Sequence, residues 1–245
     1  MANILAFDLE TSPNLAHVWG LWQQNVSLSQ LEKSTEVMCF GARWLGTKSV
    51  IFRSVHHDGK EAMLEELWRL FDEADAVMGW NSKGFDSKHV NREFLEAGMK
   101  PPSPWKELDL MQAVKAKFRF PSNKLDYVAQ RLGVGKKTPH TGFQLWLDCM
   151  AGDERAWKLM KKYQMQDVNL LIDLHSILLP WIANHPNVAL IDGIEGGCVN
   201  CGSTHLQRRG YSTTGVSKQQ RYQCQDCGKW NKSKGSVASS EMRQA

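Results

Sequence analysis

Two carboxylates follow an apolar run near the N-terminus of this 245-residue sequence. Residues 4–7 are all apolar and predict a buried strand, which Asp8 and Glu10 extend. Because side chains alternate between the faces of a strand, Asp8 and Glu10 should share one face. Neighbouring carboxylates repel each other unless a cation lies between them, and Mg2+ prefers oxygen ligands of this kind. The pair predicts a metal site, while a strand end that reaches solvent is the plainer alternative.

A second segment with a candidate acid lies late in the chain, in a long helical pattern that Asp153 caps and that runs to about residue 181. Tyr163 and Asp167 are four residues apart and therefore share one helix face. A carboxylate near a buried face needs a partner or a metal ion. An exposed aspartate beside a half-buried tyrosine is the alternative for this helix taken alone.

A third segment with a candidate acid follows the short buried strand predicted at residues 76–79. Asn81, Phe85 and Asp86 come directly after it, and Asp86 opens the next predicted helix. This segment thus lies at a predicted strand-to-helix junction.

Together these three segments resemble the three exonuclease motifs of the DEDD superfamily, which includes DnaQ-like proofreading exonucleases and the exonuclease domains of family-A and family-B DNA polymerases. The order and approximate spacing are similar, and the resemblance covers roughly residues 1–182. Residues 123–133 also look similar to a helix and turn of related exonucleases. Histidine-type members carry their histidine at the position of Lys162, whereas Tyr163 stands where tyrosine-type members carry tyrosine. The sequence is therefore most similar to the tyrosine-type branch and to the stand-alone phage-like relatives of the family-B exonuclease domain.

The resemblance implies a 3′-5′ exonuclease that hydrolyses phosphodiester bonds with two Mg2+ or Mn2+ ions, about 3.5–4 Å apart in such sites. By carry-over, Asp8 bridges the ions, Glu10 and Asp167 complete one ion site, and Asp86 holds the second. Tyr163 would orient the attacking water, because a phenol of pKa about 10 is a poor base at neutral pH.

Four further polar or aromatic residues of this part of the chain receive lesser roles. Asn81 and Phe85 are expected to shape the pocket or to touch the terminal nucleotide. Asp109 and Asp126 are interpreted as solvated or supporting acids.

Two Cys-x-x-Cys pairs lie near the C-terminus, at Cys198/Cys201 and Cys224/Cys227. Two matched pairs with this spacing predict a structural Zn2+ site with four thiolates, of the zinc-ribbon type. A redox dithiol is the weaker alternative for one pair taken alone.

Basic and aromatic residues are interleaved in the same segment. Residues 197–245 carry eight Lys/Arg against two Asp/Glu, a net charge of +6, while residues 1–196 carry 22 against 24, a net charge of −2. Cations for phosphates and aromatic rings for bases predict a nucleic-acid surface, with solubilising charge around a small core as the alternative. The candidates are Arg208, Arg209, Lys218, Arg221, Lys229, Trp230 and Lys232, with Tyr211, Tyr222 and Lys234 nearby.

The elements that must position these residues predict an α/β fold. Strands are expected at residues 36–45, 49–55 and 76–79 beside the first strand, with an amphipathic helix at 60–74 and others from residue 86 onward. The resemblance implies a ribonuclease-H-like mixed sheet flanked by helices, and the cysteine pairs add the small ribbon. The expected parts are a nuclease domain (1–185), a linker (186–197), the ribbon (198–230) and a disordered tail (231–245).

Composition is that of a soluble globular protein, and no stretch approaches the ~18 apolar residues of a membrane span. We therefore expect a cytoplasmic protein, located in the host cytoplasm if phage-encoded. DNA, especially single strands or 3′ ends, is the expected substrate, with a polymerase or replisome protein as a further possible partner. Two alternatives stay open: an exoribonuclease, and a non-catalytic module that binds nucleic acid or protein.

Overall fold

A computed structural model describes residues 1–242 and divides the chain into two compact units. The larger unit comprises Asn3–Gln112 and Phe120–Leu174. The smaller comprises Met1–Ala2, Ala113–Arg119 and the described residues from His175 onward. None of the helices within residues 1–242 is long and apolar enough to span a bilayer.

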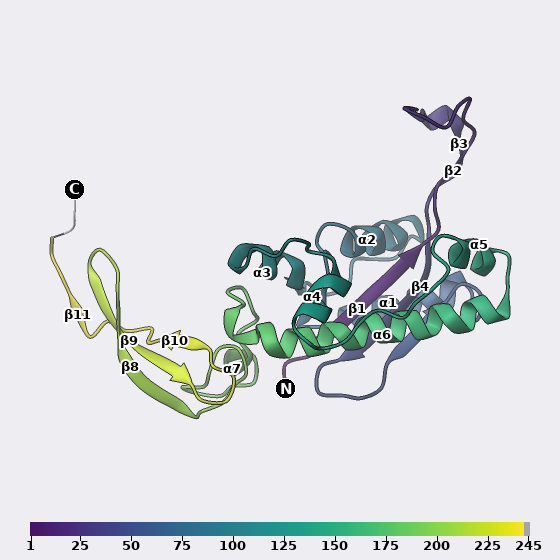
Figure 1. The fold of residues 1–245 in the computed structure, drawn as a ribbon. Helices are drawn as coiled ribbons and strands as arrows, with labels where there is room; N and C mark the ends of the chain where they lie inside the picture. Colours follow the sequence, from purple (N-terminus) through teal and green to yellow (C-terminus); the bar gives the residue numbers. More distant parts are fainter. Residues whose placement is uncertain (243–245) are drawn as a thin grey trace. The chain divides into compact units, whose positions relative to one another are not determined.

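The larger unit contains a five-stranded mixed sheet in the order β5-β4-β1-β6-β7 (Figure 1). β1 pairs antiparallel with β4 and parallel with β6. Antiparallel β4–β5 and parallel β6–β7 pairings complete the sheet. The strands are β1 (Ile4–Thr11), β4 (Val37–Trp44), β5 (Ile51–Ser54), β6 (Ala76–Gly79) and β7 (Lys106–Asp109). The predicted mixed sheet is confirmed.

Helices cover both faces of this sheet. Leu5, Phe7 and Leu9 share a core with residues of α1 and α2, and the ring of Phe7 meets that of Phe71 edge-on at 5.0 Å. Met38 and Cys39 of β4 belong to another core with α5 and α6. The helices are α1 (Lys60–Asp72), α2 (Asp86–Glu96), α3 (Leu110–Lys117), α4 (Leu125–Arg131), α5 (Gln144–Met150) and α6 (Glu154–Leu178). The even-numbered residues of β1 therefore face away from the α1–α2 layer.

Residues 12–36, which we call the arm, connect β1 to β4 in the sequence and stand away from the sheet (Figure 1). The arm contains β2 (Leu15–Ala16), the short 3-10 helix η1 (Leu28–Gln30) and β3 (Leu31–Lys33), with β2 paired to β3. Most of its large apolar side chains are exposed, with Trp19 at 99% and Trp22 at 87% exposure. The sequence pattern predicts no element here.

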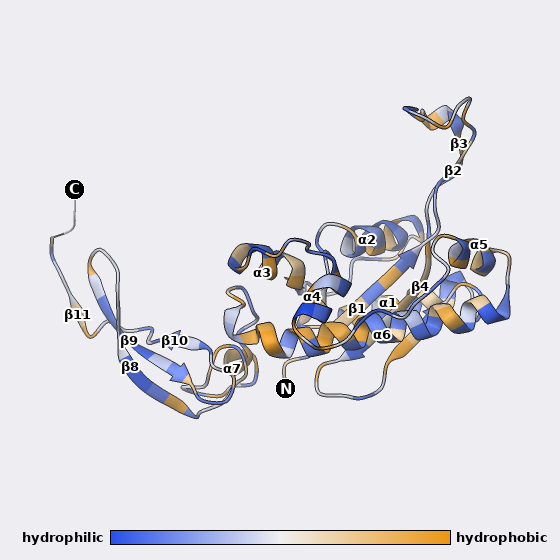
Figure 2. Ribbon diagram, viewed as in Figure 1, coloured by the Kyte–Doolittle hydropathy of each residue, from blue (hydrophilic) through white to orange (hydrophobic). Residues whose placement is uncertain are grey.

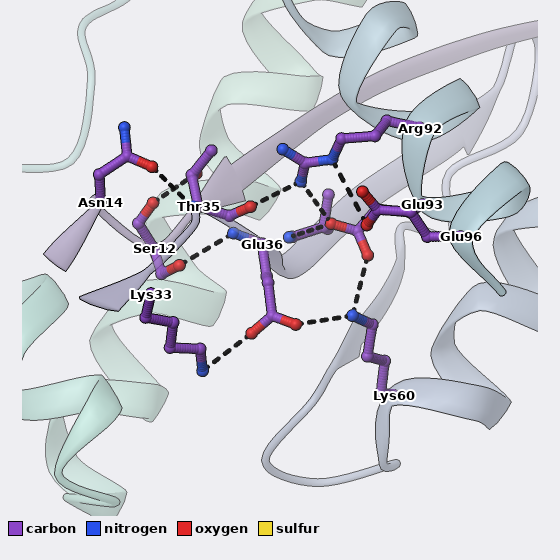
Figure 3. A network of polar contacts seen from close by, with 10 residues as sticks. Ser12, Asn14, Lys33, Thr35, Glu36, Lys60, Arg92, Glu93 and Glu96 are labelled. Carbon is purple, nitrogen blue, oxygen red and sulfur yellow. Dashed lines mark hydrogen bonds and ion pairs between the residues drawn. The ribbon is translucent and has the colours of Figure 1, made fainter. Parts of the chain in front are cut away.

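A charged network fixes the base of the arm (Figure 3). The Glu93 carboxylate, which is fully buried, pairs with Arg92 at 2.7 Å and Lys60 at 3.1 Å and accepts the N–H of Val37 at 3.0 Å. Lys60 also pairs with Glu36 at 2.8 Å. These contacts join the end of the arm to α1 and α2 and compensate the cost of burying a carboxylate.

The smaller unit contains a four-stranded antiparallel sheet in which β9 pairs with β8, β10 and β11. Its elements are η2 (Leu179–Trp181), α7 (Val188–Ile191), β8 (Leu206–Thr213), β9 (Ser217–Cys224), β10 (Trp230–Lys232) and β11 (Ala238–Ser239). Strands β8 and β9 are coloured mostly hydrophilic in Figure 2, in contrast to β1. This sheet thus has little apolar core of its own.

The units differ from the expected parts in two respects. The smaller unit takes in residues from His175, because Asn200 and Lys229 donate hydrogen bonds to the carbonyl oxygens of Leu179 (2.7 Å) and Ile182 (2.5 Å). The expected linker contains α7, and the expected disordered tail contains β11 and the end of β10. Residues 243–245 of that tail lie outside the described residues.

Candidate functional site

Strand β1 places Asp8 and Glu10 on the sheet face that α6 covers. Asp8 pairs with Gly41 of β4, and its carboxylate accepts a hydrogen bond from Gln164 of α6 at 3.2 Å. Burial raises the pKa of Asp8 well above its usual value, and Asp86, Asp167 and Glu10 add repulsion. Burial likewise raises the pKa of Glu10 to about 7. Both carboxylates therefore lie where negative charge is disfavoured unless a cation is present.

Asp86 is the first residue of α2 and reaches the end of β1. The Leu9 N–H donates to the Asp86 carboxylate at 3.4 Å, and the Asp86 side chain is buried. Burial raises the pKa of Asp86 to about 7, although its backbone hydrogen bonds oppose the shift. Asp86 therefore meets the strand that carries Asp8 and Glu10.

The turn before Asp86 is held by Asn81, whose φ of +65° is uncommon for a residue other than glycine. The Asn81 N–H donates to the Asp109 carboxylate at 3.0 Å, so the buried Asp109 supports the turn rather than being solvated. The Phe85 side chain is 41% exposed, and its ring meets that of His89 edge-on at 4.5 Å. The Phe85 ring is therefore accessible to solvent.

Helix α6 brings Tyr163, Gln164 and Asp167 to the same face of the sheet. The Asp167 side chain is fully buried, and Tyr163 is 5% exposed. Burial raises the pKa of Asp167, with Lys137 opposing the shift, and burial raises the pKa of Tyr163 above its ordinary value. Tyr163 and Asp167, which their four-residue spacing puts on one helix face, thus both lie in the interior.

Lys137 is the residue of this site that sequence reasoning missed. Its ammonium donates to the Asp167 carboxylate at 2.6 Å and to the Tyr163 hydroxyl oxygen at 2.8 Å. Burial disfavours its charge, but Asp167, Tyr163 and Asp8 outweigh burial and raise the pKa of Lys137. The only sequence signal was its place in a basic pair with Lys136.

Asp126 of α4 holds the Lys137 loop. Its carboxylate accepts the Lys137 N–H at 2.8 Å and a Gln130 side-chain N–H at 2.7 Å. Asp126 is therefore a supporting acid. Together with Asp8, Trp80 and Lys137 it lines a cavity of about 330 Å³ beside the site.

The donor groups fit a divalent cation. The buried Asp167 Oδ1 has no hydrogen-bond partner among the described residues, and four carboxylates with raised pKa values would gain from positive charge. Within residues 1–242, the carboxylates are not among the groups of three or more ligand atoms that lie within 4.8 Å of one another. The Lys137 ammonium is the positive charge at Asp167 in this arrangement.

The four cysteines Cys198, Cys201, Cys224 and Cys227, which we call the cysteine cluster, bring their Sγ atoms within 4.8 Å of one another. Cys198–Cys227 and Cys201–Cys224 are each 3.6 Å apart, and all four thiols are free. Tetrahedral Zn2+ with Zn–S bonds of about 2.3 Å separates its sulfurs by about 3.8 Å. The cluster could therefore form a zinc site.

The two knuckles of the cysteine cluster turn through glycines. Gly202 and Gly228, which follow the second cysteine of each pair, have φ of +75° and +78°. Glycine adopts this conformation without the steric cost that a Cβ would add.

Register and strand alternation gather part of the predicted nucleic-acid surface on one face of β8–β10. Lys232 lies opposite Arg221, the Arg221 guanidinium lies 5.3 Å from the Trp230 ring, and Arg209 donates to Gln223 at 2.6 Å. Arg208 is exposed and lies opposite Tyr222 in the register, and the Lys218 ammonium lies 4.2 Å from the Tyr211 ring. We call Arg209, Arg221, Trp230 and Lys232 the basic face.

Lys229 differs from its expected role. It is partly buried and donates to the Ile182 carbonyl oxygen, and burial lowers the pKa of its ammonium. Its charge is therefore used within the smaller unit rather than offered to a phosphate.

Comparisons with known proteins agree with this fold. A family model described as RNase_H superfamily matches residues 26–179, which include Asp86, Lys137, Tyr163 and Asp167 but not Asp8 and Glu10. No curated protein matches the sequence significantly.

A solved structure shares the architecture of the larger part of the chain. The family B DNA polymerase from the hyperthermophilic archaeon Pyrobaculum calidifontis superposes with a TM-score of 0.56 and 16% identity. The alignment covers 74% of this chain and 25% of the polymerase chain, so this chain spans about a quarter of the polymerase. With its mixed sheet, flanking helices and a family match over most of its length, the chain belongs to the RNase H superfamily.

Proposed function

We propose that this protein is a metal-dependent 3′-5′ exonuclease of the tyrosine type that acts on DNA. The observation that carries the proposal is the meeting of Asp8, Glu10, Asp86 and Asp167, from three separate elements, beside Tyr163. A stable fold has no need to gather four buried or half-buried acids that repel one another. A site for cations that act on phosphates explains their presence.

The four acids would hold two Mg2+ or Mn2+ ions, which would activate water and stabilise charge on the attacking and leaving oxygens of the phosphodiester. Gln164 fixes the orientation of Asp8, and the Leu9 N–H fixes that of Asp86. The Tyr163 hydroxyl oxygen accepts a hydrogen bond from Lys137, and its own O–H remains a donor group at the site. Because burial raises the pKa of Tyr163, the phenol would orient the attacking water and would not remove its proton.

Asn81 and Phe85 would border the terminal nucleotide, since the turn that carries them leads into Asp86. The cysteine cluster would bind structural Zn2+, which has no open ligand position when four thiolates surround it. The basic face would then hold a single strand through phosphate contacts and stacking on Trp230.

The deciding experiment offers 5′-labelled single-stranded DNA, duplex DNA and RNA to the full-length protein with Mg2+, with Mn2+ and with neither ion. Ion-dependent shortening of DNA from its 3′ end is the expected result. Stronger shortening of RNA would favour the exoribonuclease. Binding without shortening of any strand would favour the non-catalytic module.

Variants assign the activity to the site. Asp8→Ala and Asp167→Ala should each lower the rate by at least about a hundredfold, because each removes a ligand of the ions. Asp173→Ala is the matched control, since Asp173 is an exposed aspartate on the same helix as Asp167. Near-normal cleavage by either site variant would show that the activity does not come from these acids.

A further inference from the structure

A second group of metal-ligand side chains lies outside the proposed catalytic acids. His56 and His57 follow β5, and Glu154 is the first residue of α6. The His56 Nε2 lies 2.8 Å from Glu154 Oε1, and the His57 Nε2 lies 3.6 Å from Glu154 Oε2. Ligand atoms of all three residues fall within 4.8 Å of one another.

Both imidazole rings are oriented by contacts other than those to Glu154. The His57 Nδ1 lies 2.8 Å from the Ser54 hydroxyl, and Ser54 is fully buried. The His56 ring stacks on the buried indole of Trp157, with centroids 5.3 Å apart and planes within 9° of parallel. The rings are therefore held with their Nε2 atoms toward one carboxylate before any ligand binds.

The tautomer that a metal requires is available at His57. Ser54 Oγ already accepts the His57 backbone N–H at 3.1 Å, and the hydroxyl can also accept the Nδ1–H of the ring. A proton on Nδ1 leaves a lone pair on Nε2. A hydrogen bond of this kind on the far nitrogen orients metal-binding histidines in proteins generally.

An ordinary histidine–glutamate ion pair has a different form, and this chain supplies one. His17 and Glu32 of the arm pair at 2.9 Å with a single imidazole, and their side chains are 81% and 54% exposed. At Glu154 two imidazoles meet one carboxylate, and the His56 side chain is only 27% exposed. The second ring supplies the third ligand atom that a metal needs.

We propose that His56, His57 and Glu154 form a site for a divalent transition metal of the Zn2+ class. Two imidazole nitrogens and a carboxylate oxygen suit Zn2+, and three protein ligands leave a position for water. The site is independent of the nuclease proposal, since none of its ligands is among the four acids. Bound metal would join the loop after β5 to the start of α6, the helix that carries Tyr163 and Asp167.

The test uses the full-length protein loaded with one equivalent of Zn2+ for the cysteine cluster, in buffer with Mg2+ to compete for the carboxylate site. More Zn2+ is then added, and the acylation of each histidine by diethyl pyrocarbonate is followed by mass spectrometry. With free Zn2+ at ten times Kd, the reactive fraction of a liganded imidazole falls about tenfold. His56 and His57 should be protected to that extent, while His17 should react at an unchanged rate.

Substitutions separate this site from other zinc binding. His56→Gln and Glu154→Gln should each abolish the uptake of a second Zn2+, measured by equilibrium dialysis and metal analysis, while His17→Gln should retain it. The exposed Glu154 can be replaced without disturbing the core, so its variant serves if His56→Gln fails to fold. Unprotected His56 and His57, or a second Zn2+ retained by the Glu154→Gln variant, would overturn the proposal.

Discussion

The Lys137 ammonium lies 2.6 Å from the Asp167 carboxylate, which is fully buried. The same ammonium donates to Tyr163, so one loop residue joins the two α6 side chains of the proposed site. We call Asp8, Glu10, Asp86 and Asp167 the acidic cluster. Without a divalent ion, Lys137 is the positive charge that compensates Asp167 in this cluster. The ammonium and the ions should therefore be partly interchangeable in their effect on stability.

Lys137→Met should destabilise the protein in the absence of added Mg2+ by about 1–3 kcal/mol, because Asp167 loses a charged hydrogen-bond donor. Added Mg2+ should recover much of the loss if it binds the same carboxylates. Urea unfolding with and without Mg2+ measures both effects. Lys136→Met is the control, since Lys136 is the exposed neighbouring lysine. Equal losses for the two variants would argue against the pairing.

The stability of the fold should fall as pH rises, whereas the stability of a protein whose carboxylates are paired with cations rises with pH. The pKa values of Glu10 and Asp86 are about 7 in the folded chain, against ordinary values of 4.5 and 3.8. The folded state thus holds protons that the unfolded state has released, so stability falls as pH rises from about 4 to about 7. Without Mg2+, urea midpoints should decrease across this window, and Glu10→Gln should flatten the decrease. Stabilisation by Mg2+ should increase over the same range, because the ions bind deprotonated carboxylates.

Tyr163→Phe should lower the cleavage rate less than loss of an acid does, since the metal ligands remain while the orienting hydroxyl is lost. The fold should be retained, because the ring still fills its place beside Trp146 and His140. Single-turnover rates on a short DNA strand measure the effect. Tyr127→Phe, in α4, is the matched control. A rate equal to that of Asp167→Ala would mean that Tyr163 does more than orient water.

Gly41→Ala should move α6 away from β4, the strand in which Gly41 lies opposite Asp8 of β1. A Cβ at Gly41 would meet Gln164 Oε1 and Val168 Cγ2 at 3.1 Å and the Gln164 carbonyl oxygen at 3.3 Å. Overpacking of this kind costs about 1–3 kcal/mol and should also lower activity, because α6 carries Asp167. Thermal unfolding and cleavage rates measure the two effects. Gly215→Ala, where a Cβ meets nothing within 4 Å, should leave both nearly unchanged.

The basic face can be tested by its response to salt. Arg221→Ala should flatten the dependence of log affinity on log salt by roughly 0.7 on single-stranded DNA, if one phosphate contact is lost. Trp230→Ala should weaken binding by about 1–3 kcal/mol through lost stacking, with little change in slope. Lys48→Ala, which removes an exposed charge between β4 and β5, should change neither. Unchanged affinity and slope for both face variants would indicate that this surface docks a protein.

The local parts of the site follow from the sequence. Strand alternation places Asp8 and Glu10 on one face, and the four-residue spacing places Tyr163 and Asp167 on one side of α6, because both relationships depend only on regular backbone geometry. Lys137 could not be found in this way. It reaches Asp167 from a loop without periodicity, across 30 residues of chain.

The supporting contacts were also beyond sequence reasoning. Glu107 of β7 accepts hydrogen bonds from the Ser82 and Ser87 hydroxyls, and Asp109 accepts the Asn81 N–H, all across 20 or more residues. Such partners are decided by how β6 and β7 pair, which no local pattern encodes. The arm was not predicted from the sequence, because its apolar residues remain in solvent and do not follow the period of a helix or a strand.

The arm is an exposed segment at which a protease could cleave the chain. A protease that cuts after aromatic residues would meet Trp19 and Trp22 in full contact with solvent. A single cut there would place Asp8 and Glu10 on a short N-terminal peptide and Asp86 and Asp167 on the remainder. The two pieces would still be joined by the pairing of β1 with β4 and β6, and by the burial of Leu5 and Phe7. The acidic cluster could thus be reassembled from two separately made polypeptides, neither of which carries all four acids.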